Sequence, residues 1–278
     1  MLSSQFLMPE LIVHWLAAAL YLLSGIFFVH GLSSEKPKSL PTACRLALFG
    51  LLFHTVSLVL QWYARGHGPY LRLDESLSAL AWGAMGMFLL FNHKAIWQKS
   101  FGVILAPCAF LLMLVRIFAT SEPGSPPATF TGIWFIMHVI SIIPAMGAFL
   151  IALSAAILYL LKKRGQGGFR SRLPSLEVLD ACVYKYAGFA FILWGFMIIA
   201  GAFWAEQSWG RYWGWDTIET WSFITWLLLG LLLHLQRFFN WQGERAAWAM
   251  MACFVVSILT LFLLPLVLGS IHADYLIL

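Results

Sequence analysis

The chain has 278 residues, of which 61% are hydrophobic and only 10% are charged. A soluble domain has about 45–50% apolar and about 25% charged residues. The composition therefore excludes a soluble globular enzyme, a disordered chain and a nucleic-acid-binding module, and the formal net charge of +5 does not change this. It predicts an all-α, polytopic integral membrane protein with one transmembrane domain over residues 1–278.

Eight apolar runs are long enough to cross about 30 Å of hydrocarbon, so we expect about eight transmembrane helices. The third and fourth runs are short for a span. Residues 1–10 lack the basic segment that begins a cleaved signal, so the first helix should be retained. The runs lie near 11–32, 43–63, 76–92, 101–118, 133–161, 183–205, 218–238 and 247–268.

Basic residues gather in the loops on one side of the predicted membrane. Of the 17 Lys and Arg, 13 fall in four segments that alternate helices would bring to the same side. The positive-inside rule makes that side cytoplasmic, which places both termini outside. The four segments are 33–45, 92–100, 162–185 and 237–247, and the basic residues left outside are Arg65, Arg72, Arg116 and Arg211.

Six of the 14 tryptophans lie in the segment 204–226, which joins the sixth and seventh predicted helices on the outer side. An aromatic belt at the headgroup level explains one or two tryptophans at a helix end. It does not explain four between Trp209 and Trp221, interleaved with Gly210 and Gly214. Glycines permit close approach and indoles offer flat apolar surface, so the segment indicates a planar hydrophobic ligand.

Asp216 and Glu219 stand three residues apart, immediately before an apolar run. This spacing is typical of a capping box. In a capping box the side chain of the residue before the helix accepts a hydrogen bond from a backbone N–H of the first turn, and the side chain three residues later accepts one from the backbone N–H of the first residue. We therefore predict that the seventh helix begins at Thr217. The structural role is compatible with a polar contact to a ligand.

The tryptophan segment resembles the WWD signature of haem-handling proteins, and the chain is similar to the CcsA/ResC branch, the polytopic subunit of system II cytochrome c synthetases. Two departures are Thr217-Ile218, where the family often has Pro-Lys, and Ala273-Asp274-Tyr275, where it has Ser-Tyr after a histidine. The matching residues are Trp209-Gly-Arg-Tyr-Trp213-Gly-Trp215-Asp216, Glu219-Thr-Trp221-Ser-Phe-Ile-Thr-Trp226, Arg65-Gly-His67-Gly-Pro69, Glu75-Ser76-Leu77, His138, His234 and His272.

Imidazole is a natural axial ligand of haem iron, and an ionisable residue within a membrane suggests a functional site. His138 and His272 are both predicted on the outer side, and the resemblance implies that they ligate the iron of an external haem b. His234 lies about 22 Å along the seventh helix from Glu219. The resemblance implies that it ligates a second haem within the membrane, with the other ligand from a partner subunit. His54, near the middle of the second predicted helix, is a lesser candidate for that second ligand. The remaining predicted haem contacts are Trp209, Trp213, Trp215, Asp216, Trp221 and Trp226.

The resemblance further implies a place in the bacterial cytoplasmic (inner) membrane, with the active face extracytoplasmic. The chain would deliver haem across the membrane and present it for thioether attachment to the CXXCH motif of apocytochrome c, as part of a haem lyase complex with a ResB/CcsB-like membrane subunit. No nucleic-acid partner is expected. Three alternatives stay open: a HemX-like haem-binding or regulatory protein, an exporter of haem or another planar molecule, and a structural membrane subunit.

Overall fold

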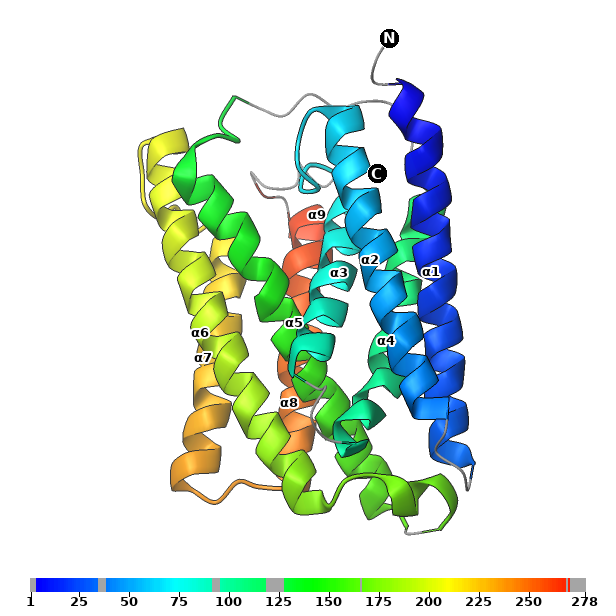
Figure 1. Ribbon diagram of the computed structural model, residues 1–278. Helices are drawn as coiled ribbons and strands as arrows, with labels where there is room; N and C mark the ends of the chain where they lie inside the picture. The colour runs from blue at the N-terminus through cyan, green and yellow to red at the C-terminus, as the bar shows by residue number, and fades with distance from the viewer. Residues whose placement is uncertain are drawn as a thin grey trace. The chain divides into compact units, whose positions relative to one another are not determined.

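A computed structural model describes residues 4–34, 39–91, 96–118, 128–165, 167–268 and 270. Helices make up most of these residues, which confirms the predicted all-α class (Figure 1). Within the described ranges, seven helical segments are long and apolar enough to cross a membrane. The chain is therefore a polytopic membrane protein. The placement of both termini outside remains a prediction.

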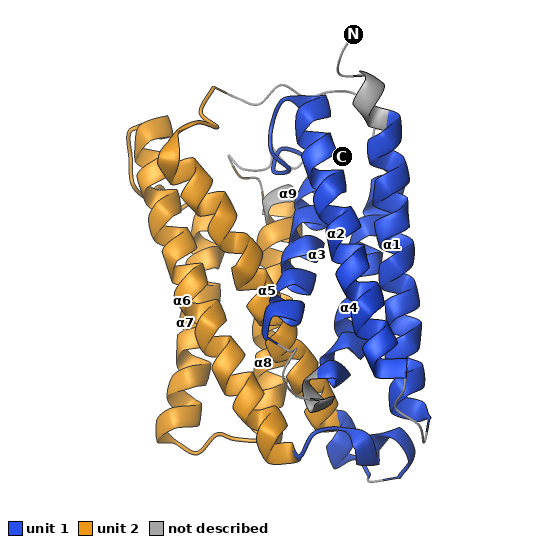
Figure 2. Ribbon diagram, viewed as in Figure 1, with its two compact units in different colours: residues 1–124, 161–175, 278 blue, residues 125–160, 176–277 orange. Residues whose placement is uncertain are grey.

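The chain divides into two compact units, coloured separately in Figure 2. Unit 1 comprises residues 1–124, 161–175 and 278, and unit 2 comprises residues 125–160 and 176–277. The helices of unit 1 are α1 (Ser4–Ser33), α2 (Ser39–Arg65), α3 (Leu73–Phe91) and α4 (Gly102–Leu114), with the short 3-10 helices η1 (Ile96–Phe101), η2 (Val115–Phe118) and η3 (Gly168–Arg172).

Small residues let the helices of unit 1 approach closely, as is common in membrane bundles. α1 packs along α2, where a Cβ on Gly50 would lie 2.8 Å from the ring of Tyr21. α1 also packs on α4, where a Cβ on Gly25 would lie 3.0 Å from Pro107. The buried faces of α1 and α2 carry further alanines, among them Ala17, Ala18, Ala43 and Ala47.

Unit 2 contains most of α5 (Gly132–Lys163), followed by α6 (Leu176–Trp209), α7 (Thr217–Phe238) and α8 (Glu244–Ile258). α8 continues through the π-helical turn η4 (Leu259–Leu263) into α9 (Leu264–Leu268), so the last predicted run is one helix with a local widening. α7 packs against both α6 and α8.

Each of the eight predicted apolar runs lies in a helical stretch of the structure. The third run corresponds to α3, which begins with the acidic pair Asp74 and Glu75 and is not among the seven long apolar segments. The fourth is interrupted by 3-10 turns at both ends but still qualifies over Lys99–Phe118. Of the two runs that are short in the sequence, only the fourth is thus among the long apolar segments.

Candidate functional site

The tryptophan-rich turn of unit 2 begins where α6 ends. Gly210 has φ +69°, and its N–H donates to the carbonyl of Glu206 at 2.8 Å. A glycine in the left-handed conformation is a common end to a helix because it has no Cβ to clash. The chain therefore leaves α6 directly after Trp209 and does not continue as one long helix into α7.

The capping box predicted at the start of α7 is present, and α7 begins at Thr217 as expected. The Ile218 N–H donates to Asp216 Oδ2 at 3.2 Å, and the Asp216 N–H donates to Glu219 Oε2 at 3.1 Å. The same Glu219 oxygen also accepts from the Gly214 N–H at 2.7 Å. One carboxylate thus holds the turn to the helix at two points.

Trp215 stands apart from the other tryptophans of the turn. Its φ is +57°, a left-handed conformation that costs a residue with a Cβ roughly 1–2 kcal/mol. Its side chain is 72% exposed, with a T-shaped contact to Trp213 at 5.8 Å. The turn therefore exposes a large indole even though the backbone conformation of Trp215 is unfavourable.

Trp221 and Trp226 lie within α7, and the indole of Trp226 packs against α6. The Trp226 indole N–H donates to the Phe191 carbonyl at 3.1 Å, and the two rings stack at 4.9 Å. A Cβ on Gly195 would lie 2.7 Å from Trp226 Nε1, so α6 has a glycine where the indole needs space. The Trp221 carbonyl accepts from Thr225 Oγ1 at 2.8 Å.

His138 projects from the first turns of α5 onto α6. Its Nδ1 lies 2.9 Å from the carbonyl oxygen of Met197, and its ring stacks at 5.8 Å on Trp204. A Cβ on Gly201 would lie 2.7 Å from this Nδ1, so glycine is required where the imidazole crosses α6. A carbonyl can only accept, so Nδ1 carries the proton and the lone pair of the neutral ring is on Nε2.

This arrangement fits an axial haem ligand. Ligating histidines usually donate their other N–H to a carbonyl or carboxylate, which fixes the tautomer and the ring plane. Haem supplies its own four nitrogens and needs only one or two from the protein. Consistently, in the part of the chain that the structure describes, no three His, Cys, Asp or Glu side chains are grouped to hold a bare metal ion.

His272, the second predicted external ligand, lies outside the described residues. Ser270, two positions earlier, donates from Oγ to Asp216 Oδ2 at 2.5 Å. The last described residue of the chain is thus attached to the tryptophan-rich turn.

His234 is exposed, one turn before the end of α7, and its ring contacts Phe238 at 4.8 Å. A Cβ on Gly230, one turn before His234, would lie 3.1 Å from the ring of Phe191, so the space beside Gly230 is already filled by that side chain.

His54 belongs to unit 1 and is fully buried. Its Nε2 lies 2.8 Å from Ser78 Oγ and its Nδ1 lies 3.3 Å from the hydroxyl of Tyr21. Both nitrogens are therefore engaged between helices, and a ligand role would require one of these hydrogen bonds to break.

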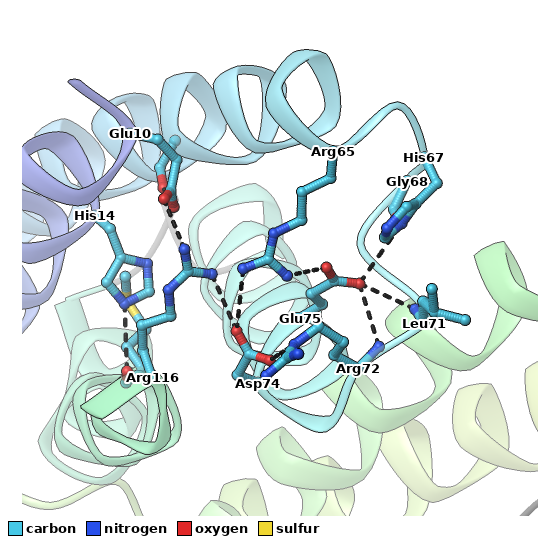
Figure 3. Close-up of polar contacts among 12 residues, drawn as sticks. Glu10, His14, Arg65, His67, Gly68, Leu71, Arg72, Asp74, Glu75 and Arg116 are labelled. Carbon is cyan, nitrogen blue, oxygen red and sulfur yellow. Dashed lines mark hydrogen bonds and ion pairs between the residues drawn. The ribbon is translucent and has the colours of Figure 1, made fainter. Parts of the chain in front are cut away.

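Unit 1 also contains a buried cluster of charges that sequence analysis missed (Figure 3). Asp74 contacts three arginines: Arg72 at 3.0 Å, Arg116 at 3.0 Å and Arg65 at 3.7 Å. Arg116 continues to Glu10 at 2.7 Å, and Arg65 pairs with Glu75. We call these six residues the outer ion cluster: Glu10, Arg65, Arg72, Asp74, Glu75 and Arg116.

Glu75 also organises the turn between α2 and α3. Its Oε2 accepts from the backbone N–H of Leu71 at 3.0 Å and of Arg72 at 3.2 Å. His67, in the same turn, has Nδ1 3.8 Å from that oxygen. A signal was present in the sequence, because three of the four basic residues outside the predicted cytoplasmic segments are in this cluster. These arginines are exceptions to the predicted charge asymmetry, and carboxylates beside them neutralise their charge.

The family model and the relatives that match this chain all point to one family. A family model described as cytochrome C assembly protein matches residues 70–272. Three relatives, each named cytochrome c biogenesis protein CcsA, illustrate the similarity. The Synechococcus sp. (strain RCC307) protein is 30% identical, with 90% of this chain and 90% of the relative aligned. The Prochlorococcus marinus (strain MIT 9303) protein is 31% identical, with 87% of this chain and 86% of the relative aligned. For Chlamydomonas reinhardtii it is 32%, over 68% of this chain and 56% of the relative.

Proposed function

Because the chain belongs to the cytochrome c assembly protein family and so has a role in cytochrome c maturation, we propose that it is the haem-binding subunit of a system II cytochrome c synthetase. In this role it delivers haem b across the bacterial inner membrane and presents it on the extracytoplasmic side to apocytochrome c. A ResB/CcsB-like membrane subunit completes the haem lyase complex.

The observation that carries the proposal is the setting of His138. Met197 and Gly201 hold its imidazole in one orientation on α6, with the lone pair on Nε2. His138 and His272 would together hold the haem. The exposed indole of Trp215, with Trp213 in the same turn and Trp209 at the end of α6, would offer it flat apolar surface and limit the access of water.

When bound, haem b supplies the vinyl groups to which the two thiols of a CXXCH motif add. The chain's own contribution is proximity and orientation, which can supply a large part of a rate enhancement without a protein nucleophile. His138 and His272 would hold the haem, and the tryptophan-rich turn would shield it from water.

His234 and a histidine of the partner subunit would hold a second haem within the membrane. His54 is the weaker candidate for that second ligand, since its two nitrogens are engaged with Ser78 and Tyr21. Two of the three alternative roles, a HemX-like haem-binding protein and a haem exporter, would use the same ligands without forming thioethers.

Visible spectroscopy of the chain purified with its partner tests the proposal. We expect low-spin bis-imidazole bands that are lost in His138→Ala and partly restored by added imidazole, because imidazole can occupy the vacated space. His30→Ala is the matched control, since His30 is an exposed histidine of unit 1 that contacts Ser39. A His138→Ala spectrum like that of the wild type would contradict the ligand assignment.

A second measurement separates the functions that share these ligands. Cells with the wild-type chain should accumulate a reporter cytochrome c with covalently attached haem, and cells with His138→Ala should not. Bound haem with no thioether product, in the presence of the partner, would favour the HemX-like or exporter role.

A further inference from the structure

Trp204 is a buried tryptophan of α6 to which the proposed function assigns no role. Its side chain is only 3% exposed, and it lies one turn and a half before the helix ends at Trp209. Its ring contacts those of Phe130, Phe135, His138 and Trp209, at centroid distances from 5.1 to 5.8 Å. One side chain thus touches both the proposed haem ligand His138 and the proposed haem contact Trp209.

Three residues of α6 that surround the His138 ring lie on one face of the helix. Met197, Gly201 and Trp204 are four and three positions apart, a spacing that places side chains above one another along a helix. The Met197 carbonyl oxygen lies 2.9 Å from His138 Nδ1, and Gly201 leaves the space that the ring occupies. The plane of the Trp204 indole is 27° from that of the imidazole. The ring is therefore held at one edge by a hydrogen bond and on one face by an indole.

The hydrogen bond and the ring contact fix different properties of His138. The terminal torsion of a histidine side chain has a broad, roughly two-fold preference, so the rotamer alone defines the ring plane loosely. The bond to the Met197 carbonyl selects the tautomer, but the ring can still tilt about the line that joins Nδ1 to that oxygen. A nearly parallel indole beside the ring limits this tilt. Trp204 therefore defines the plane, which the hydrogen bond by itself does not.

Trp204 is itself fixed by the chain that leads into α5. Its Nε1–H donates to the carbonyl oxygen of Thr129 at 2.8 Å. Phe130 and Phe135 stack on each other at 4.7 Å, and both contact the indole. A buried tryptophan whose N–H is paired and whose ring is packed has little freedom to move. The start of α5 and the histidine that this helix carries are thus aligned on the same indole.

We infer that Trp204 is a positioning residue, which sets the plane of the His138 imidazole and ties that plane, through Trp209, to the tryptophan-rich turn. The inference rests on the proposed function, in which His138 ligates the haem iron. Residues that orient a ligating histidine typically change metal affinity about 10–100-fold when they are replaced. Trp204 acts on the haem through His138, so its effect should vanish when that imidazole is absent.

Trp204→Phe and Trp194→Phe form a matched pair of variants on α6. Each removes a buried indole whose N–H donates to a backbone carbonyl, of Thr129 in the first case and of Ser222 at 3.0 Å in the second. The ring of Trp194 contacts Phe149 at 5.7 Å. Thermal unfolding should show similar losses of Tm for the two variants, because each loses one buried hydrogen bond and part of a packed ring.

Haem titration of the full chain, purified with its partner, separates the two variants. We expect the haem affinity to fall about 10–100-fold in Trp204→Phe and to keep its wild-type value in Trp194→Phe. The electron paramagnetic resonance spectrum of the oxidised low-spin haem should change only in Trp204→Phe, because this spectrum depends on the planes of the axial imidazoles. Equal losses of affinity in the two variants would show general loosening of unit 2 and overturn the inference.

A double-mutant cycle distinguishes positioning of His138 from direct contact with the haem. In the His138→Ala background, Trp204→Phe should cause no further loss of haem affinity, because the imidazole that Trp204 orients is gone. The two changes should therefore be strongly non-additive. A loss by the same factor in both backgrounds would overturn the inference and assign Trp204 to the haem surface itself.

Nuclear magnetic resonance of isotope-labelled histidine side chains in the haem-free chain gives a readout that does not depend on haem. His138→Ala identifies the His138 signals. The wild type and Trp194→Phe should show one neutral tautomer with the proton on Nδ1, and Trp204→Phe should show averaged signals. Unchanged His138 signals in Trp204→Phe would overturn the inference.

Phe135→Leu is a second variant that loosens Trp204 without removing it, since the Phe135 ring packs on the indole. It should shift the His138 signals in the same direction as Trp204→Phe, but by less. Should Trp204→Phe fail to fold, unchanged signals in Phe135→Leu would overturn the inference. A wild-type chain that binds no haem would contradict the proposed function alone, because the resonance comparison would still report whether Trp204 orients His138.

Discussion

The regions at the predicted outer ends of the two units differ in how their charged and aromatic side chains are accommodated. In unit 1 three arginines and three carboxylates neutralise one another in the outer ion cluster. In unit 2 the tryptophan-rich turn leaves the indole of Trp215 and the ring of Tyr212 exposed. The charges of the first region are paired within the unit, whereas the second region leaves two large aromatic rings exposed.

This difference separates structural residues from residues available to a ligand. Removal of a member of the outer ion cluster should lower stability first and function only as a consequence. Removal of an exposed group of the turn should change ligand binding with little change in stability. Four predictions test this contrast.

The largest effect is expected for Asp74→Ala in the outer ion cluster. The change leaves three arginines without their shared carboxylate in a buried site, and breaking a buried ion pair costs about 3–5 kcal/mol. Thermal unfolding in detergent measures the loss. A stability within about 0.5 kcal/mol of the wild type, the range of ordinary surface substitutions, would mean that the cluster is hydrated and of little structural weight.

Gly201→Ala and Gly195→Ala form a matched pair on α6. Each adds a Cβ that would lie 2.7 Å from a ring nitrogen, of His138 in the first case and of Trp226 in the second. Both should lose about 1–3 kcal/mol through overpacking. Only Gly201→Ala should shift the haem spectrum, because only it displaces the proposed ligand. Equal spectral shifts in the two variants would show that general loosening of unit 2, and not His138, controls the haem.

Glu219→Ala removes the acceptor for the N–H groups of Gly214 and Asp216. We expect a loss of about 0.5–2 kcal/mol, as for other capping residues. Faster amide hydrogen exchange should be confined to residues 210–218. Glu219→Gln retains an acceptor oxygen and is the control. Exchange that rises equally in both variants would indicate that the charge of Glu219, and not its geometry, orders the turn.

The smallest effect on stability is expected for Trp215→Asn. Asparagine tolerates the left-handed conformation better than tryptophan, and the indole is exposed, so stability should stay within about 0.5 kcal/mol of the wild type. The haem content of the purified chain should nevertheless fall. A loss of stability with unchanged haem content would assign Trp215 to packing.

Much of the fold could be predicted because it depends on local patterns. Apolar runs located the helices, and the three-residue spacing of Asp216 and Glu219 located the first residue of α7. Both follow from interactions within one or two turns of helix. The tryptophan segment and the resemblance that it carries also led to the family that the comparisons show.

The assignment of individual tryptophans and histidines could not be made in this way. Trp215 and Trp226 belong to one sequence motif, yet one is exposed in a turn and the other is stacked on Phe191. From the sequence, His54 is a candidate haem ligand within the membrane, yet in the structure its ring lies within hydrogen-bond distance of Tyr21 and Ser78. Which ring is available depends on neighbours contributed by other helices.

By itself, the sequence determined a multi-pass helical membrane protein of a cytochrome c assembly family, with a tryptophan-rich turn before α7. The tertiary structure decided which polar groups form ion pairs or hydrogen bonds within the protein. Glu10 and Arg116 are 106 positions apart in the sequence and form an ion pair. His138 is oriented by Met197, 59 positions away. Hydropathy and capping act along one helix, whereas pairing, tautomer and exposure are set by the helices that pack beside it.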